Sequence, residues 1–260
     1  MRENIVSETR MIIQIIIIML LGRIMLNLVM MVNGPQNIEG VVMSDESSAT
    51  EMILGAFDTM GENAATVDSI YQSIDSNIKP VAPYLQALSL QESRAGLDPG
   101  LEKNHSYGVT QIDPIRMFDF QRDYNEVRPD GQRSTYFHRG QAVNETMEKL
   151  GYKDFDISQL ATVVQNQDGS FKYDANGFKY KDDPIVNMLL TRMLMFKDPQ
   201  GVGDTPTQWD ALWKRTWNTG KNAASNDPSK VDMLENLQEI ERLRTLEEVN
   251  EVIDNANKFK

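Results

Sequence analysis

The sequence predicts a protein of the mainly α class (α+β), in which helices form the core, with one small β-hairpin and an N-terminal transmembrane helix. Three observations lead to this prediction. Apolar residues recur at helical spacing in several segments from Ala64 onwards. The stretch Phe171–Tyr180 alternates aromatic and polar residues around Asn176-Gly177, a dipeptide typical of hairpin turns. The segment Met11–Val32 is almost wholly apolar.

Size and composition exclude several classes of function. With 260 residues, the chain can hold one domain of ordinary size and some appendages. Its net charge of -12 and its pI of about 4.7 argue against a nucleic-acid partner, because phosphate binding needs a surplus of Lys and Arg. The chain has no cysteine, which excludes disulfides and thiol catalysis. With only His105 and His138 as imidazole ligands, we expect neither a metal nor another cofactor.

Residues 1–33 are predicted to be a membrane anchor. Met11–Val32 would form a helix of roughly 33 Å, enough to cross a hydrocarbon core of about 30 Å. Arg23 at its centre costs about 2.5–3.5 kcal/mol, whereas each Ile, Leu or Val returns roughly 0.3–0.6 kcal/mol. Thirteen such apolar residues offset Arg23 and leave something over for Gln14 and Asn27.

Two other interpretations of this segment are a cleaved signal peptide and a buried core helix. No small-residue cleavage site follows Gly22, and the segment has no polar face, so an uncleaved anchor is preferred. Arg2 and Arg10 precede the segment, and the next cation after Arg23 is Lys79. The positive-inside rule then places the N-terminus in the cytoplasm and the rest of the chain outside.

The next two segments are predicted to be a tether over 34–63 and the start of a helical domain over 64–228. Prolines at 80 and 83 suit the first turn of a helix whose apolar stripe runs through Leu88 to Glu92. Glu92 is therefore expected on the core-facing side, at the C-terminal end of that helix. Partial desolvation and the negative end of the helix dipole both raise the pKa of a carboxyl group there, as a general acid requires.

The remaining segments are less regular. Residues 119–182 lack clear periodicity apart from the hairpin, whose aromatic residues pair across the strands or form a sugar-stacking platform. Pro184 opens a helix, and Trp209 and Trp213 belong to the next one. The C-terminal extension, 229–260, has apolar residues at every third position, which favours two shorter helices broken near Thr245 over one long coiled coil.

Three short motifs follow one another in a distinctive order. Glu92-Ser93 closes a helix, and Gly108–Ile112 (Gly-Val-Thr-Gln-Ile) places Gln111 nineteen residues after Glu92. Trp217–Gly220 (Trp-Asn-Thr-Gly) then ends a later helix. In this order and spacing the chain resembles the lytic transglycosylases, the goose-lysozyme-like family that cleaves peptidoglycan.

The resemblance covers roughly Ile78–Met117 and Asp182–Ala224, and it makes 119–182 an insertion. It implies a lysozyme-like helical fold for the domain over 64–228. The sequence departs from the family pattern at Trp217, where the family usually has Tyr, and at Thr110, where it usually has Met. The first departure removes a hydroxyl from the site, and the second changes a contact with the sugar.

The mechanism that the resemblance implies uses a single carboxyl group, Glu92. Protonated Glu92 donates to the glycosidic oxygen between N-acetylmuramic acid and N-acetylglucosamine, and the ionised Glu92 then takes the proton of the C6 hydroxyl. A 1,6-anhydromuramoyl end forms, and no water is consumed. Ser93, Gln111 and Asn218 would orient the muramoyl N-acetyl group and Glu92, and Tyr107 would line the sugar groove. The residues alone leave another role open, in which Ser93 and Asn218 make local backbone bonds and Tyr107 packs on the core.

Two alternatives to this function stay open. A second carboxylate such as Asp98, Glu102 or Asp113 would give a lysozyme that hydrolyses the same bond, although Asp98 and Asp113 stand next to prolines, as in turns and helix junctions. The other alternative is a membrane-bound structural virion protein that keeps the fold without catalysis. The expected settings are an envelope-spanning machine with its domain in the periplasm, or a bacteriophage virion that opens the wall during genome entry. Expected partners are glycan strands, the membrane through Met11–Val32, and proteins that bind the C-terminal helices.

Overall fold

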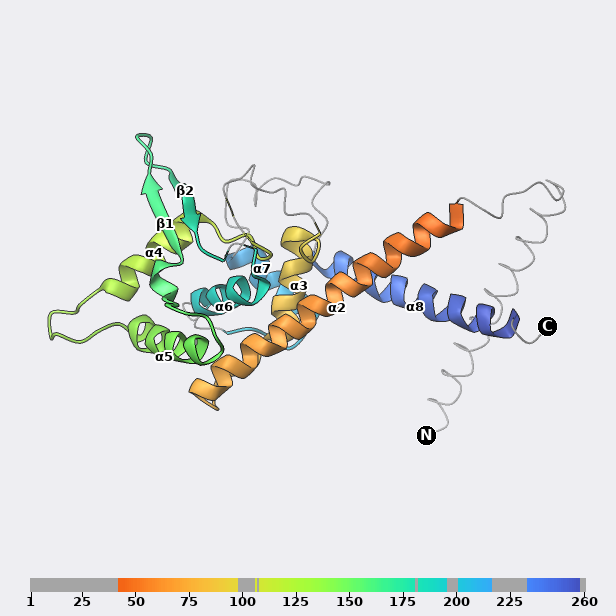
Figure 1. Cartoon of the computed structure of the whole chain (residues 1–260), viewed down its shortest axis with the longest axis horizontal. Coiled ribbons are helices and arrows are strands. Elements are labelled where there is room, and N and C mark those ends of the chain that lie inside the picture. The colour runs from red at the N-terminus through yellow and green to blue at the C-terminus, as the bar shows by residue number, and fades with distance from the viewer. Residues whose placement is uncertain are drawn as a thin grey trace. The chain divides into compact units, whose positions relative to one another are not determined.

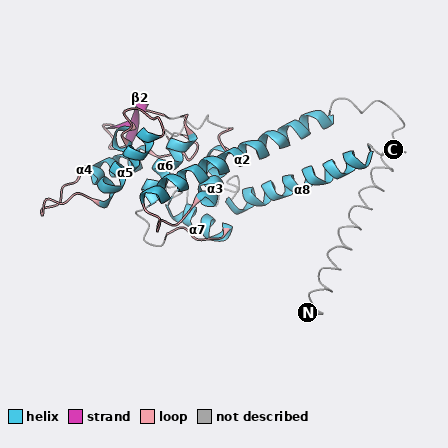
Figure 2. Ribbon diagram, turned by 60° about the horizontal axis from the view of Figure 1, so that its bottom comes forward, coloured by secondary structure: helices cyan, strands magenta, loops and turns pink. Residues whose placement is uncertain are grey.

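The computed structural model describes residues 42–97, 106, 108–180, 182–195, 201–216 and 233–257. Most of these residues are helical, and the two strands form one antiparallel hairpin (Figure 1, Figure 2), so the predicted mainly α class with a small hairpin is confirmed. Backbone contacts divide the chain into two units, Met1–Ala49 and Thr50–Lys260. The first is described only over 42–49, the beginning of helix α2, and the fold below is that of the second.

The predicted membrane anchor, Met11–Val32, lies outside the described residues. Among the helices that the structure does describe, none combines the length and the apolar character of a membrane span. The anchor therefore stays a prediction from the sequence.

Helix α2 (Val42–Ile74) is continuous through most of the segment that was expected to be a tether, so that expectation is wrong for the described part of 34–63. Leu54, Phe57 and Met60 recur at helical spacing and are buried in the core. Gly61, within this helix, marks a close contact. A Cβ at this position would lie 2.6 Å from Nε2 of Gln86, whose amide donates to the Phe57 carbonyl at 2.8 Å.

Helix α3 (Ala82–Ser93) begins where the prolines predicted, with Pro83 in its first turn. Its free backbone N–H groups are satisfied from α2, because the buried Asp68 carboxylate accepts from Val81 N and Ala82 N at 2.6–2.9 Å. Helix α6 (Pro184–Met195) lies deepest in the core, since every residue from Val186 to Leu194 is buried. It supplies the fixed surface on which the candidate site is built.

Helices α4 (Pro114–Asn125) and α5 (Thr135–Lys149) occupy a region in which no clear periodicity was expected. The buried positions of α5 are Gly140, Val143 and Met147, spaced by three and four residues. A Cβ at Gly140 would lie 2.4 Å from a Tyr124 ring carbon, so the glycine supplies a close helix–helix contact. An apolar stripe with a glycine at one of its positions escapes a search for large apolar side chains.

Strands β1 (Ala161–Gln165) and β2 (Phe171–Phe178) pair beside α4, after the short 3₁₀ helix η2 (Ile157–Gln159) (Figure 1). The predicted position of the turn is wrong, because Asn176-Gly177 lies within β2 and the chain reverses at Asp168-Gly169. Gly169 has φ +84°, which suits a tight turn. The two Phe-Lys-Tyr runs therefore do not pair with each other across the strands, and Phe171 faces Gln165 instead.

Helices α7 (Pro206–Thr216) and α8 (Met233–Asn257) complete the described fold. The expected break near Thr245 is wrong, because α8 is one helix across this position. The Thr245 hydroxyl donates to the Glu241 carbonyl at 3.0 Å, so the helix accommodates this polar residue internally. Its apolar side chains beyond the contact with the domain, such as Val252, are exposed.

Candidate active site

Glu92 occupies the last turn of α3, and the chain reverses immediately after it. Arg94, Ala95 and Gly96 follow with φ values of +50°, +56° and +82°. Two of these residues carry side chains in the left-handed region, which costs roughly 1–2 kcal/mol for each. Backbone hydrogen bonds from Arg94 N and Ala95 N to the carbonyls of the last helical turn, each 3.0 Å long, hold this reversal. The Glu92 side chain is half-buried at the edge of this chain reversal.

A buried indole holds the Glu92 carboxylate. Trp213 Nε1 donates to Glu92 Oε1 at 2.5 Å, and only 5% of the Trp213 side chain is exposed. Because the indole N–H can only donate, the oxygen that it contacts acts as an acceptor. Trp213 was expected only as a helix residue. A buried tryptophan needs a partner for its N–H, and this need is the signal that could have singled it out.

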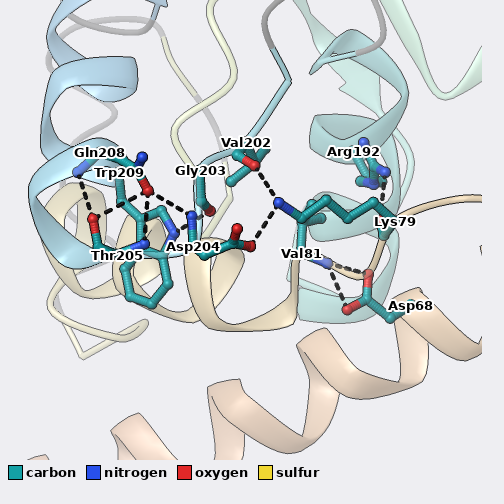
Figure 3. A network of polar contacts seen from close by, with 10 residues as sticks. All are labelled: Asp68, Lys79, Val81, Arg192, Val202, Gly203, Asp204, Thr205, Gln208 and Trp209. Carbon is teal, nitrogen blue, oxygen red and sulfur yellow. Dashed lines mark hydrogen bonds and ion pairs between the residues drawn. The ribbon is translucent and has the colours of Figure 1, made fainter.

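A network of polar contacts fixes the start of α7, the helix that carries Trp213 (Figure 3). Lys79 Nζ forms an ion pair with Asp204 at 2.6 Å and donates to the Val202 carbonyl at 2.9 Å. The buried Arg192 of α6 donates to the Lys79 carbonyl at 2.9 Å. Gln208 Oε1 accepts from the backbone N–H groups of Asp204 and Thr205, which precede the first turn of α7.

Arg116, on α4, interacts electrostatically with the Glu92 carboxylate. Burial lowers the pKa of Arg116, and the negative charges of Asp113 and Glu92, together with Tyr84, oppose that shift. The attraction is mutual, so Arg116 favours the ionised form of Glu92. This influence acts against the desolvation and helix-dipole effects expected from the sequence.

The Gly108–Ile112 run is a loop held by three contacts, two from α6 and one from β2. Gly108 has φ +80°, and a Cβ there would lie 1.2 Å from Oδ1 of Asn187, a fully buried residue of α6. The buried hydroxyls of Thr110 and Thr191 lie 2.7 Å apart, which joins the loop to α6 a second time. Tyr173 of β2 donates to the Ile112 carbonyl at 2.9 Å. Thr110 is thus part of the scaffold.

The side chains of Ser93 and Gln111 also bind the scaffold. Ser93 Oγ lies 3.0 Å from the Ser89 carbonyl and 2.8 Å from the Val109 carbonyl, and it accepts from Gly96 N at 2.9 Å. A single hydroxyl proton serves the two carbonyls, so Ser93 ties the helix end to the loop through backbone contacts, the alternative left open by the sequence. Gln111 has φ +49°, and its Nε2 donates to the Gly108 carbonyl at 2.8 Å. The structure brings Glu92, Ser93 and the loop together, with the two polar side chains serving as braces.

The other expected site residues, Tyr107 and Asn218, lie outside the described residues, as does Trp217. The convergence of Glu92, Gln111 and Asn218 on one groove therefore stays a prediction. Among the candidates for a second carboxylate, Asp98 and Glu102 also lie outside. Asp113 caps α4, because its Oδ1 accepts from Ile115 N at 3.0 Å.

The described part of the chain offers no group of three or more His, Cys, Asp or Glu side chains that could hold a metal ion. The reactive groups at the end of α3 are the carboxyl group of Glu92, the indole donor of Trp213 and the nearby cation of Arg116. Comparisons of the chain with protein-family models, with curated proteins and with solved structures find no match.

Proposed function

We propose that this protein is a peptidoglycan lytic transglycosylase with Glu92 as its general acid and base. The observation that carries the proposal is the setting of Glu92. A half-buried carboxylate at a helix end is held by the buried Trp213 N–H and lies beside the braced Gly108–Ile112 loop. The order and spacing of these motifs resemble those of the family, and the helical fold with its small hairpin is consistent with it.

The contact with Trp213 determines where the catalytic proton resides. Because Oε1 accepts from the indole, the proton of the acid form lies on Oε2. Oε2 donates it to the glycosidic oxygen, and the bond from that oxygen to the anomeric carbon of N-acetylmuramic acid breaks. The C6 hydroxyl then attacks the anomeric carbon and returns its proton to Oε2. Glu92 ends protonated, as it began, and the products are an anhydromuramoyl end and a free hydroxyl on N-acetylglucosamine.

Arg116 stabilises the ionised state that Glu92 adopts between these two proton transfers.

The setting proposed for this activity is the bacterial envelope, with the chain anchored in the membrane by Met11–Val32 and the domain outside the cytoplasm. A bacteriophage virion protein that opens the wall locally during genome entry is the preferred case, because the motif resemblance makes the segment 119–182 an extended insertion. The exposed apolar side chains of α8 support a protein partner at the C-terminal end.

A non-catalytic structural protein with the same fold is the second candidate. The side chains around Glu92 favour this function, since the Ser93 hydroxyl and the Gln111 amide already donate hydrogen bonds to backbone carbonyls. A lysozyme-type hydrolysis would need a second carboxylate to activate water, and Asp113 is engaged as a helix cap.

Digestion of purified peptidoglycan separates these functions. We expect wild type to release muropeptides with anhydromuramoyl ends and Glu92→Gln to release none, because an amide cannot supply the proton. The Gln carbonyl can still accept from Trp213, so this variant keeps the local contact. Glu145→Gln, on the exposed surface of α5, is the matched control and should cleave normally. Hydrated reducing ends would indicate a lysozyme, and no products from wild type would contradict both enzymatic functions.

A further inference from the structure

A second site lies apart from Glu92, at the N-terminal end of α6. An open cavity of about 570 Å³ is lined by residues that include Asn63 of α2, Tyr152, Tyr180, Asp182 and Asp183. Its volume falls within the range of ligand pockets, about 300–1,000 Å³. Both tyrosines belong to the segment 119–182, which the family resemblance treats as an insertion. Nothing in the proposed reaction uses this cavity.

Two tyrosine rings form the aromatic wall of the cavity. Tyr152 and Tyr180 meet edge to face, with centroids 5.7 Å apart and planes at 68°. The buried Phe155 lies behind them, 6.0 Å from each ring. An edge-to-face pair leaves ring faces uncovered, whereas a stacked pair would hide them. The Tyr180 side chain is 37% exposed.

Tyr180 also has a strained backbone, with φ +60°, which costs a residue with a side chain roughly 1–3 kcal/mol. Two contacts hold it there, because the Tyr180 carbonyl accepts from Asp183 N at 3.0 Å and from Asn187 Nδ2 at 3.2 Å. Strain of this kind is concentrated at ligand sites. These two contacts hold the backbone that places the ring of Tyr180 against Tyr152.

The polar groups of the cavity define the ligand chemistry. Asp183 caps α6 by accepting from Ile185 N and Val186 N, and its second oxygen accepts from the Tyr152 hydroxyl at 2.9 Å. Among the described residues, the Asp182 carboxylate and the Asn63 amide have no hydrogen-bond partner. These two groups are therefore available to a ligand.

Several ligand classes fit this cavity poorly. Two carboxylates repel an anion, and Asp183 already occupies the backbone N–H groups at the start of α6. A wholly apolar ligand would desolvate Asp182 without replacing its hydrogen bonds with water. A neutral pyranose satisfies both walls, since its C–H face stacks on an aromatic ring and its hydroxyls donate to a carboxylate and an amide oxygen.

We infer that this cavity is an accessory glycan-binding site, which takes a sugar ring of the strand outside the catalytic groove. This inference rests on the proposed function for the identity of the glycan. Asn187 joins the two regions, because its Nδ2 donates to the carbonyls of Tyr180 and Asp183, and its Oδ1 lies against Gly108. A strand bound at the cavity is thus held next to the loop that braces Glu92.

Binding of peptide-free glycan strands to the full chain tests the inference. All variants carry Glu92→Gln, so that strands are not consumed. Adding Tyr180→Ala should weaken binding about tenfold, and Asp182→Asn about threefold, because stacking and a charge-assisted acceptor are lost. Asp182 is exposed, so its variant should fold normally. Phe118→Ala removes an exposed aromatic ring from α4 and should bind like the parent.

Three outcomes would overturn the inference. The first is no binding of glycan strands by the parent, and the second is equal binding by all four proteins. The third is displacement of the bound strand by stem peptides with a free amine, when free glycan strands do not displace it. The last would indicate an amine site between tyrosine and carboxylate. The proposed function fails separately, if wild type releases no muropeptides while Tyr180-dependent binding persists. Normal cleavage by wild type with equal binding by all variants would reject the accessory site alone.

Discussion

Replacing Gly108 with alanine tests how firmly α6 holds the loop beside Glu92. Two costs combine at this position. A side chain at φ +80° costs roughly 1–2 kcal/mol. The new Cβ would also overlap Asn187 Oδ1, at 1.2 Å, and force the buried amide to move. That amide donates to two backbone carbonyls, each bond contributing about 0.5–1.5 kcal/mol. The sum is a loss of about 2–5 kcal/mol in the free energy of unfolding.

The chain provides a matched control in Gly131. Its φ of +81° nearly equals that of Gly108, but a Cβ there would meet nothing within 4 Å. Gly131→Ala therefore measures the backbone cost alone, about 1–2 kcal/mol. Urea unfolding followed by circular dichroism gives both values, and their difference isolates the contact with Asn187. We expect Gly108→Ala to be the more destabilising by about 1–3 kcal/mol. Equal values would refute the packing of the loop on α6.

Three other variants test the surroundings of the carboxylate. Trp213→Phe keeps a ring but removes the N–H that holds Glu92 Oε1, so cleavage of peptidoglycan should slow by roughly 10–100-fold; an unchanged rate would exclude Trp213 from the site. Arg116→Gln removes a charge that favours ionised Glu92, so the alkaline limb of the pH–rate profile should move to higher pH, and a shift to lower pH would contradict this assignment. Thr110→Val leaves the buried Thr191 hydroxyl without its partner and should cost about 1–3 kcal/mol in thermal unfolding, whereas a neutral effect would show that the pair does not anchor the loop.

The sequence predicted helices best where a start signal and a stripe of large apolar residues agreed. Pro83 and Pro184 each stand in the first turn of a helix, and α3 and α6 follow with the expected buried faces. Glu92 was placed correctly at the end of α3, because the start signal at Pro83 and the apolar residues through Leu88 both fall within this helix. Local rules suffice when no distant segment overrides them.

Several of the errors involve glycine, which has two roles. Gly61 and Gly140 permit close contact between packed segments, yet in the sequence Gly61 lies within the expected tether and Gly140 is a gap in a stripe. Judged from the neighbouring residues alone, Asn176-Gly177 is a stronger turn signal than Asp168-Gly169. The pairing of Tyr173 with Val163, and the contact of Tyr173 with Ile112, depend on residues distant in the sequence.

The site was predicted only in part for a similar reason. The motif order identified Glu92 and the Gly108–Ile112 loop, but no spacing rule places Trp213 opposite a glutamate that precedes it by more than a hundred residues. The roles of Ser93 and Gln111 depend on which backbone carbonyls lie within reach, and only the folded loop determines that. Thr110 likewise acquires its role from Thr191.

The mass of the glycan ends released from peptidoglycan tests the central claim most directly. Wild type, Glu92→Gln and Glu145→Gln are incubated with the same purified walls, and the soluble muropeptides are weighed. A transglycosylase leaves ends that are lighter by one water than those of a lysozyme. The proposed role of Glu92 predicts anhydro ends from wild type and from Glu145→Gln, and none from Glu92→Gln. Anhydro ends that persist undiminished in Glu92→Gln would contradict it.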